Sequence, residues 1–116
     1  MALGYELYGS CALNLAMSIK AYDPKMPILL VHDDNSIAEL TKEELSIFDV
    51  LKKADPADYL VNGKPQYQRM KLCVNKYSDF DQTLYIDVDT LWFPNKKISN
   101  LFMNLEDKEF LIGKNG

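Results

Sequence analysis

The sequence predicts an α/β fold with a mostly parallel sheet. Short apolar runs typical of buried strands alternate with segments whose apolar residues recur at helical spacing. The run MPILLVH, over 26–32, is bounded by Pro and Asp residues, as expected for a strand buried on both faces. A second run, TLYID over 83–87, has the same character. With 116 residues and no repeat or low-complexity tract, the chain is expected to form one domain over residues 1–116.

The first elements are expected to be a strand end, a helix and a buried strand. Residues 1–3 are interpreted as the last part of a strand, because a helix follows almost at once. That helix is predicted over 9–22, with Ser10 as its cap and apolar residues at helical spacing. Asp23 and Pro24 are expected to end it, and the 26–32 strand follows.

The remaining elements follow from caps, turn signals and further apolar runs. Thr41 and Glu44 form the sequence pattern of a capping box, which predicts a helix through about Phe48. The pairs Asp55-Pro56 and Asn62-Gly63 are turn signals. The other expected elements are a short strand over 49–52, a helix over 65–77, the strand over 83–87, a shorter strand over 91–93, a helix over 98–105 and a strand beginning at 110–112.

Composition excludes several classes of protein. The net charge is −4 and no basic stripe is present, so we expect no nucleic-acid partner. No apolar stretch approaches the ~20 residues that span a bilayer, and no leader pattern appears, so no transmembrane segment is expected. Two cysteines, Cys11 and Cys73, are too few for a disulfide framework or a zinc site. A cytoplasmic location is therefore the expectation.

Both ends of the sequence predict a piece of a longer domain. A helix follows the strand end at residues 1–3 almost directly, and the sequence stops at Gly116 just after a strand begins. Such a truncation is expected to leave a sheet edge or an apolar face uncovered. We therefore expect the chain to self-associate as a homo-oligomer.

Carboxylates follow both buried runs, at the strand ends where parallel sheets bind ligands. Asp87 and Asp89 end the 83–87 run, and two carboxylates one residue apart suit Mg²⁺ or Mn²⁺, which clamp a diphosphate. The bare Asp-x-Asp pattern arises about once by chance in a chain of this composition. A second copy, Asp79-Phe80-Asp81, lies in the preceding turn and lacks a strand leading into it. A solvated strand-end turn is the competing interpretation of Asp87 and Asp89.

Asp33, Asp34 and His32 lie where a ligand would bind, but for each of them the structural interpretation is favoured. Asp33 and Asp34 suit turn chemistry and helix capping, and His32 suits a structural role at the end of a buried strand. 

The aromatic and basic candidates are ambiguous in the same way. Tyr5 and Tyr8 are able to stack on a base, although core packing is commoner. Arg69 and Lys71 lie two residues apart on the predicted 65–77 helix and therefore point in different directions, so one of them is able to reach phosphate.

The segment RMKLCVNKYSDFDQTLYIDVDTLWFP, over 69–94, resembles the core of GT-A nucleotide-sugar glycosyltransferases. It is most similar to glycosyltransferase family 8, the group of glycogenin and the bacterial galactosyltransferases. In that group a helix bearing Arg or Lys, a turn with Tyr and a strand ending in Asp-x-Asp follow in this order. The opening LGYELYGSCALNLAMSIKAYDPKMPILLV also resembles the start of the family, with a weaker likeness over 35–64.

The resemblance implies a Rossmann-like GT-A fold and a set of donor-binding residues. Asp87 and Asp89 match the metal ligands for Mn²⁺ (or Mg²⁺), and Tyr8 matches the aromatic that packs on uracil. Lys71 and Arg69 match basic residues near the sugar and diphosphate. The full set of implied donor-binding positions is Leu3, Tyr5, Tyr8, Arg69, Lys71, Asp87, Val88 and Asp89.

The resemblance implies transfer of a hexose from a UDP-sugar to an acceptor hydroxyl, with retention of configuration. The acceptor, a glycan, a lipid or a protein, is not specified. The carboxy-terminal half of the family, which supplies a third metal ligand (a histidine) and the acceptor site, has no counterpart here, and His32 does not match that histidine. The isolated 116-residue chain is therefore expected to be inactive in transfer.

Three other interpretations stay open. A haloacid-dehalogenase-like phosphatase uses Asp-x-Asp-x-Thr, whereas Asp87-Val88-Asp89-Thr90 lacks the residue before Thr and lies far from the amino terminus. A receiver-type signalling domain accepts phosphate on an aspartate, and ILLVHDDN resembles its acidic pair, but too few residues follow Asp89 for its remaining elements. The third is a catalytically silent domain that keeps only the fold.

Overall fold

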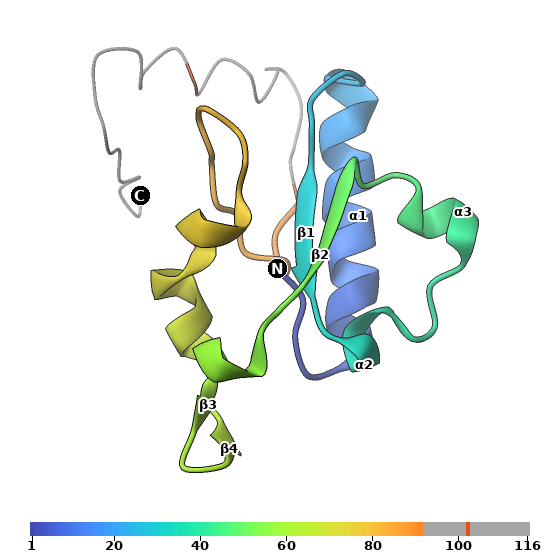
Figure 1. Cartoon of the computed structure of the whole chain (residues 1–116). Helices are drawn as coiled ribbons and strands as arrows, with labels where there is room; N and C mark the ends of the chain where they lie inside the picture. The colour runs from blue at the N-terminus through green and yellow to red at the C-terminus, as the bar shows by residue number, and fades with distance from the viewer. Residues whose placement is uncertain (92–101, 103–116) are drawn as a thin grey trace.

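The computed structural model describes residues 1–91 and 102, and its centre is a two-stranded parallel sheet (Figure 1). Strand β1 (Leu29–His32) pairs with β2 (Val50–Lys53) in the register Leu29 to Val50. On the other edge of β1, Ala2 forms an isolated parallel bridge to His32, and the Ala2 amide donates to the Val31 carbonyl at 2.8 Å. This small sheet has helices and parallel pairing, and Ala2 bridges β1 where a strand end was expected, whereas the Rossmann-like GT-A fold stays a prediction.

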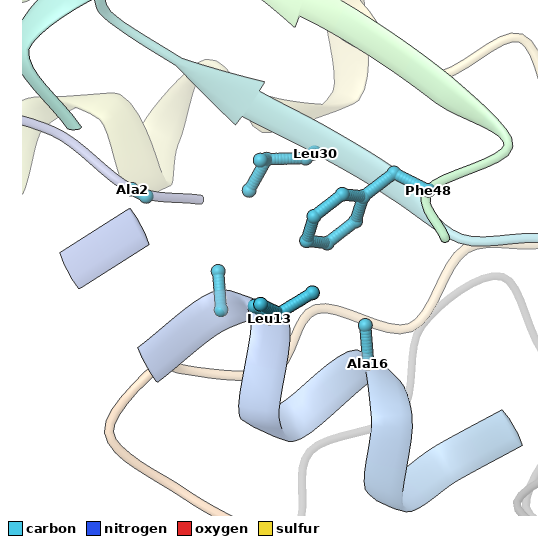
Figure 2. Packing of buried hydrophobic residues seen from close by; sticks show 6 residues of the cluster. Ala2, Leu13, Ala16, Leu30 and Phe48 are labelled. Atoms are coloured by element: carbon cyan, nitrogen blue, oxygen red, sulfur yellow. The ribbon is translucent and has the colours of Figure 1, made fainter. Parts of the chain in front are cut away.

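Helix α1 (Glu6–Tyr22) covers one face of the sheet (Figure 1). Figure 2 shows the core on this side, where Leu13 and Ala16 of α1 face Leu30 of β1 and Phe48. Ala2 closes the same cluster at the strand end. The ring of Phe48 comes from the loop before β2, so a residue outside regular structure completes this layer.

The opposite face is covered by two 3₁₀ helices, η2 (Tyr67–Leu72) and η3 (Val74–Tyr77). Their buried residues Met70 and Tyr77 pack with Val31 of β1. Successive side chains of a strand point to opposite faces, so Leu30 faces α1 and Val31 faces η2 and η3. The prediction that this strand is buried on both faces is confirmed.

The ends of α1 and β1 differ from the sequence prediction for local reasons. Helix α1 begins at Glu6, so Ser10 lies inside the helix and does not cap it. Asp23 ends the helix as predicted, and its amide donates to Ile19. Strand β1 begins at Leu29, later than predicted, and just before it the Asp49 carboxylate accepts a hydrogen bond from the Ile28 amide at 2.7 Å.

Two single-turn helices flank the sheet. Helix α2 (Asp34–Ile37) directly follows β1 and was not predicted. Helix α3 (Lys42–Leu45) has the predicted capping box of Thr41 and Glu44, but it ends before Phe48, whose ring turns into the core.

The segment over 65–77 is not the single α-helix that its spacing predicted. After η1 (Pro56–Asp58), strands β3 (Leu60–Val61) and β4 (Lys64–Pro65) form a hairpin, so Pro65 is a strand residue. Asn62 and Gly63, with φ of 52° and 77°, supply the left-handed turn that a two-residue hairpin needs. The chain then forms two short 3₁₀ helices, η2 and η3, each of which buries one side chain, Met70 and Tyr77.

No strand forms over 83–87, and this prediction was wrong. Ile86 packs beside Leu15 and Ile19, but Leu84 and Tyr85 are exposed, so the run is not buried as predicted. The backbone has no ladder with any described residue. Leu91 is likewise outside any strand, and the predicted elements over 92–93, 98–101, 103–105 and 110–112 lie outside the described residues.

Close packing of α1 against α2 predicts an unusual outcome for Gly9→Ala. A Cβ at Gly9 would lie 1.7 Å from the Ser36 carbonyl oxygen, so the two helices would have to separate. Inside a helix, Ala is normally about 1 kcal/mol more favourable than Gly. Here we expect a loss of about 2 kcal/mol or more in the free energy of unfolding by urea denaturation. The exposed neighbour variant Ser10→Ala should change it by less than ~0.5 kcal/mol, and a stabilised Gly9→Ala would contradict the packing.

Candidate functional site

A hollow of about 440 Å³ lies where residues 1–8, η2 and residues 85–89 meet. Its size is in the range of small-molecule pockets, about 300–1,000 Å³. Seven of the eight positions proposed from sequence line it: Leu3, Tyr5, Tyr8, Lys71, Asp87, Val88 and Asp89. The eighth, Arg69, is exposed and does not line the hollow. The structure therefore brings together segments that lie more than 60 residues apart in the sequence.

Asp87 is the most connected carboxylate of the hollow. Its Oδ1 accepts a hydrogen bond from the Tyr85 hydroxyl at 2.8 Å and lies 3.5 Å from the Lys71 ammonium. The Thr90 hydroxyl donates to the Asp87 carbonyl at 2.6 Å and fixes the turn that follows. Both side-chain partners are on Oδ1, and within the described part of the chain Oδ2 accepts no hydrogen bond. Oδ2 is thus the oxygen available to a ligand.

Tyr85 is held in its protonated form next to this carboxylate. Burial raises the pKa of its hydroxyl well above the usual range, and the hydrogen bond to Asp87 raises it further. The negative charges of Asp87 and Asp89 act in the same direction. The hydroxyl is therefore a proton donor to Asp87 throughout the neutral pH range.

Asp89 lies in a turn at the edge of the hollow. Tyr85, Asp87 and Asp89 line the hollow together with Val88, which also packs against the Leu30 cluster. The Asp89 carboxylate forms no hydrogen bond or ion pair with any other described residue and is exposed. It is the free member of the pair.

Two tyrosines at the start of α1 form an aromatic wall. The rings of Tyr5 and Tyr8 meet edge to face, with centroids 5.6 Å apart and an interplanar angle of 73°. Tyr5 is 63% exposed and Tyr8 is 37% exposed, so neither ring is a core residue. Core packing, the competing interpretation of these tyrosines, therefore does not hold, and the rings are available for stacking.

The loop that carries Leu3 and Tyr5 is tied to the end of β1 by Asp33. Its Oδ2 accepts the Gly4 amide at 2.7 Å, and its Oδ1 accepts the Ser36 amide at 2.9 Å as the N-cap of α2. The buried Ser36 hydroxyl donates to the Ala2 carbonyl at 2.8 Å. Gly4 has φ of 95°, and a Cβ there would lie 2.9 Å from the Tyr67 ring, so the position requires glycine.

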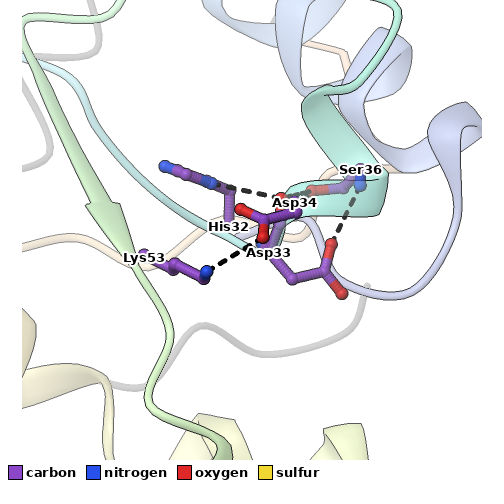
Figure 3. A network of polar contacts seen from close by, with 5 residues as sticks. All are labelled: His32, Asp33, Asp34, Ser36 and Lys53. Carbon is purple, nitrogen blue, oxygen red and sulfur yellow. Dashed lines mark hydrogen bonds and ion pairs between the residues drawn. The ribbon is translucent and has the colours of Figure 1, made fainter.

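The other residues after β1 have structural roles (Figure 3). The capping interpretation of Asp33 is confirmed, and Asp34 pairs with Lys53 at 2.9 Å on an exposed surface. His32 is buried, with its Nδ1 3.2 Å from the Asp33 carbonyl oxygen, as a structural histidine would be. Asp79 of the second Asp-x-Asp pairs with Lys52 at 2.7 Å and does not line the hollow.

Metal binding here would depend on Asp87 and Asp89 together with ligand oxygens. Among residues 1–91 and 102, no group of three His, Cys, Asp or Glu side chains is arranged to hold a metal ion. Among the described residues, one oxygen of Asp87 and the carboxylate of Asp89 have no partner, and such carboxylate oxygens are nevertheless a donor set suited to a hard cation that keeps water or phosphate ligands. The residues present therefore fit Mg²⁺ or Mn²⁺ bound jointly with a diphosphate.

Sequence reasoning missed two groups of site residues. Tyr85 shares the alternation of Asp87 and Asp89, so the period of two was a usable signal for it. Tyr67 and the bond from Gly4 to Asp33 have no such signal, because their partners lie far away in the sequence.

No family model, curated protein or solved structure matches this chain. In the part of the chain that the structure describes, no helix combines the length and the apolar character needed to cross a membrane.

The double role of Asp33 predicts that its two oxygens are both needed. Asp33→Asn keeps one acceptor oxygen and replaces the other with an amide donor, so either the cap or the Gly4 bond is lost. We expect a loss of about 1–2 kcal/mol in the free energy of unfolding, measured with urea. Asp34→Asn breaks only an exposed ion pair and should cost less than ~0.5 kcal/mol. Equal effects of the two variants would contradict the assigned role.

The buried amino terminus predicts a pH dependence of stability. Burial lowers the pKa of the Met1 amine from 8.0 to about 6, and the Asp87 charge only partly opposes this. The unfolded chain therefore binds more protons than the folded one between pH 6 and 8, so stability should rise with pH across that window. The rise should be on the order of 2 kcal/mol in urea denaturation. Acetylation of the amine should remove this component, and an unchanged pH slope after acetylation would contradict it.

Proposed function

We propose that this chain is the donor-binding part of a metal-dependent glycosyltransferase of the GT-A type, which takes a UDP-sugar and transfers its hexose to an acceptor hydroxyl. One observation carries the proposal: seven residues that the family resemblance singles out line a single hollow of small-molecule size. They include a carboxylate pair, an ammonium group and an aromatic wall, which are the groups that a nucleoside diphosphate requires.

The acidic end of the hollow suits the diphosphate and its cation. Oδ2 of Asp87 and the carboxylate of Asp89 are the proposed metal ligands, and Tyr85 and Lys71 hold Oδ1 of Asp87 in place. When bound, Mn²⁺ or Mg²⁺ would neutralise charge on the UDP leaving group. Lys71 stands beside Asp87 and adds a second positive charge for the phosphates.

The other end of the hollow suits the base and the sugar. The exposed face of the Tyr8 ring is proposed to stack on uracil. The Tyr5 ring contacts the Tyr8 ring edge to face. Leu3 and Val88 add apolar surface to the lining of the hollow. Apart from the two carboxylates proposed as metal ligands, the described residues of the hollow include no obvious nucleophile, which agrees with a reaction driven by departure of UDP and by positioning, with retention of configuration. A cytoplasmic location belongs to the same proposal.

The phosphate-accepting alternatives gain no support from a specific observation on the described residues. A receiver domain would need the acidic pair after β1, yet Asp33 uses both oxygens on backbone amides. Asp34 is exposed on Lys53 and lies outside the hollow. The acidic groups that do gather are those at Asp87 and Asp89.

Calorimetric titration of UDP with and without Mn²⁺ tests the proposal. We expect UDP to bind at least ~10-fold more tightly with Mn²⁺, because the diphosphate completes the coordination shell of the metal. Asp89→Ala should abolish this coupling. UMP, which lacks the second phosphate, should show much weaker coupling than UDP.

Asp79→Ala is the matched control, since it removes an aspartate from the other Asp-x-Asp outside the hollow. It should leave the coupling intact. Equal UDP affinity with and without Mn²⁺, or unchanged coupling in Asp89→Ala, would reject the metal assignment.

A further inference from the structure

The ion pair between Lys71 and Asp87 is the longest one among the described residues. The Lys71 ammonium lies 3.5 Å from Oδ1 of Asp87, whereas the other ion pairs of the described chain are 2.9 Å or shorter. An ammonium that donates a hydrogen bond to a carboxylate lies at about 2.7–2.9 Å. Charge attraction alone therefore holds the Lys71 ammonium beside Asp87.

Asp87 is held at several points, whereas the Lys71 side chain is held at its base only. The Tyr85 hydroxyl donates to Oδ1 of Asp87 at 2.8 Å, and the Thr90 hydroxyl donates to the Asp87 carbonyl at 2.6 Å. The backbone of Lys71 is anchored by its neighbour Met70, which is fully buried, but the Lys71 side chain is 46% exposed. The ammonium, on its flexible stem, is thus able to leave Asp87 while the carboxylate keeps its position.

A divalent cation at the proposed metal position would lie next to this ammonium. Oδ2 of Asp87 is the proposed ligand, and it belongs to the same carboxylate as the Oδ1 that Lys71 faces. Like charges a few ångströms apart repel more strongly at a protein surface than in bulk water. A cation that binds alone must therefore push the ammonium away. A cation that arrives with a diphosphate brings anionic oxygens that accept the displaced ammonium.

We propose that Lys71 is a specificity-determining residue, which makes the site select a cation together with a diphosphate over the free cation. Its ammonium neutralises Asp87 before any ligand binds, opposes a divalent cation that arrives alone, and turns to the phosphates when both arrive together. Lys71 lines the hollow from η2, so its ammonium is able to reach phosphates bound there. This inference rests on the proposed function, because it takes Asp87 and Asp89 as the metal ligands.

Lys71→Gln tests the inference by its opposite effects on two ligands. Electron paramagnetic resonance of free Mn²⁺ gives the affinity for Mn²⁺ alone, and calorimetry gives the affinity for UDP without metal. We expect the variant to bind Mn²⁺ alone at least ~5-fold more tightly than the wild type, because no ammonium opposes the cation. It should bind UDP without metal at least ~5-fold more weakly, because the phosphates lose a cationic partner. A general loss of structure would not strengthen one affinity while weakening the other.

Arg69→Gln is the matched control, because it removes the same charge from η2 at an exposed position that does not line the hollow. Both affinities should change by less than ~2-fold in this variant, since salt screens exposed charges that lie farther away. Lys71→Arg keeps the positive charge and should stay within ~2-fold of the wild type for Mn²⁺ alone. Adding Asp89→Ala to Lys71→Gln should remove the gain in Mn²⁺ affinity, because the cation loses one of its two carboxylates.

Equal Mn²⁺ affinities of Lys71→Gln and Arg69→Gln would overturn the inference, as would undetectable Mn²⁺ binding to Lys71→Gln. An unchanged affinity of Lys71→Gln for UDP without metal would also overturn it. Failure of the proposed function looks different, because it is seen in the wild type as a UDP affinity that Mn²⁺ does not change. If Mn²⁺ strengthens UDP binding to the wild type while Lys71→Gln behaves like Arg69→Gln, the inference alone fails.

Discussion

The bonds of the Asp33 carboxylate are the constraint on which the rest of the site depends. One oxygen caps α2 and the other holds the Gly4 amide, so a single side chain joins the end of β1 to the loop before α1. Ser36 strengthens the same junction through the Ala2 carbonyl. Because Gly4 has a left-handed φ and Tyr67 covers it, the direction in which α1 leaves the sheet is fixed. These bonds hold residues 2–4 in place, and Tyr5 and Tyr8, which follow them, line the hollow.

The chemistry of the proposed site follows from this junction and from the path of residues 85–89. Ile86 and Val88 pack against the hydrophobic clusters, and Tyr85, Asp87 and Asp89 line the hollow beside them. Tyr85 and Lys71 occupy one oxygen of Asp87, so the carboxylate is oriented before any ligand arrives. In metal sites, hydrogen-bond partners of this kind orient the ligand, and their loss typically costs about 10–100-fold in metal affinity. The proposed donor site therefore depends on three separate segments held by one core.

Features governed by local chemistry could be predicted from the sequence, whereas features that need a distant neighbour could not. The burial of β1, the capping box at Thr41 and the stop at Asp23 follow from adjacent residues, and all three are present. The strand over 83–87 failed because a strand needs a paired neighbour, which a local apolar pattern does not reveal, and Leu84 and Tyr85 of this run are exposed. The helix over 65–77 failed because Asn62-Gly63 forms a hairpin that draws Pro65 into β4. Seven residues of the hollow were predicted from the sequence. Tyr67 and the Asp33 bond to Gly4 were not, because both depend on partners that lie far away in the sequence.

The most direct test of the central claim, that one hollow holds a cation and a diphosphate together, is paramagnetic broadening of backbone amide signals by Mn²⁺ in the presence of UDP. The account predicts that signals of residues 3–8, Lys71 and 87–89 broaden first, at substoichiometric Mn²⁺, because these residues surround a single metal position. Signals of residues 79–81, from the other Asp-x-Asp, and of α3 should persist at the same Mn²⁺ concentration. Broadening centred on residues 79–81, or spread evenly over the acidic surface, would contradict the account.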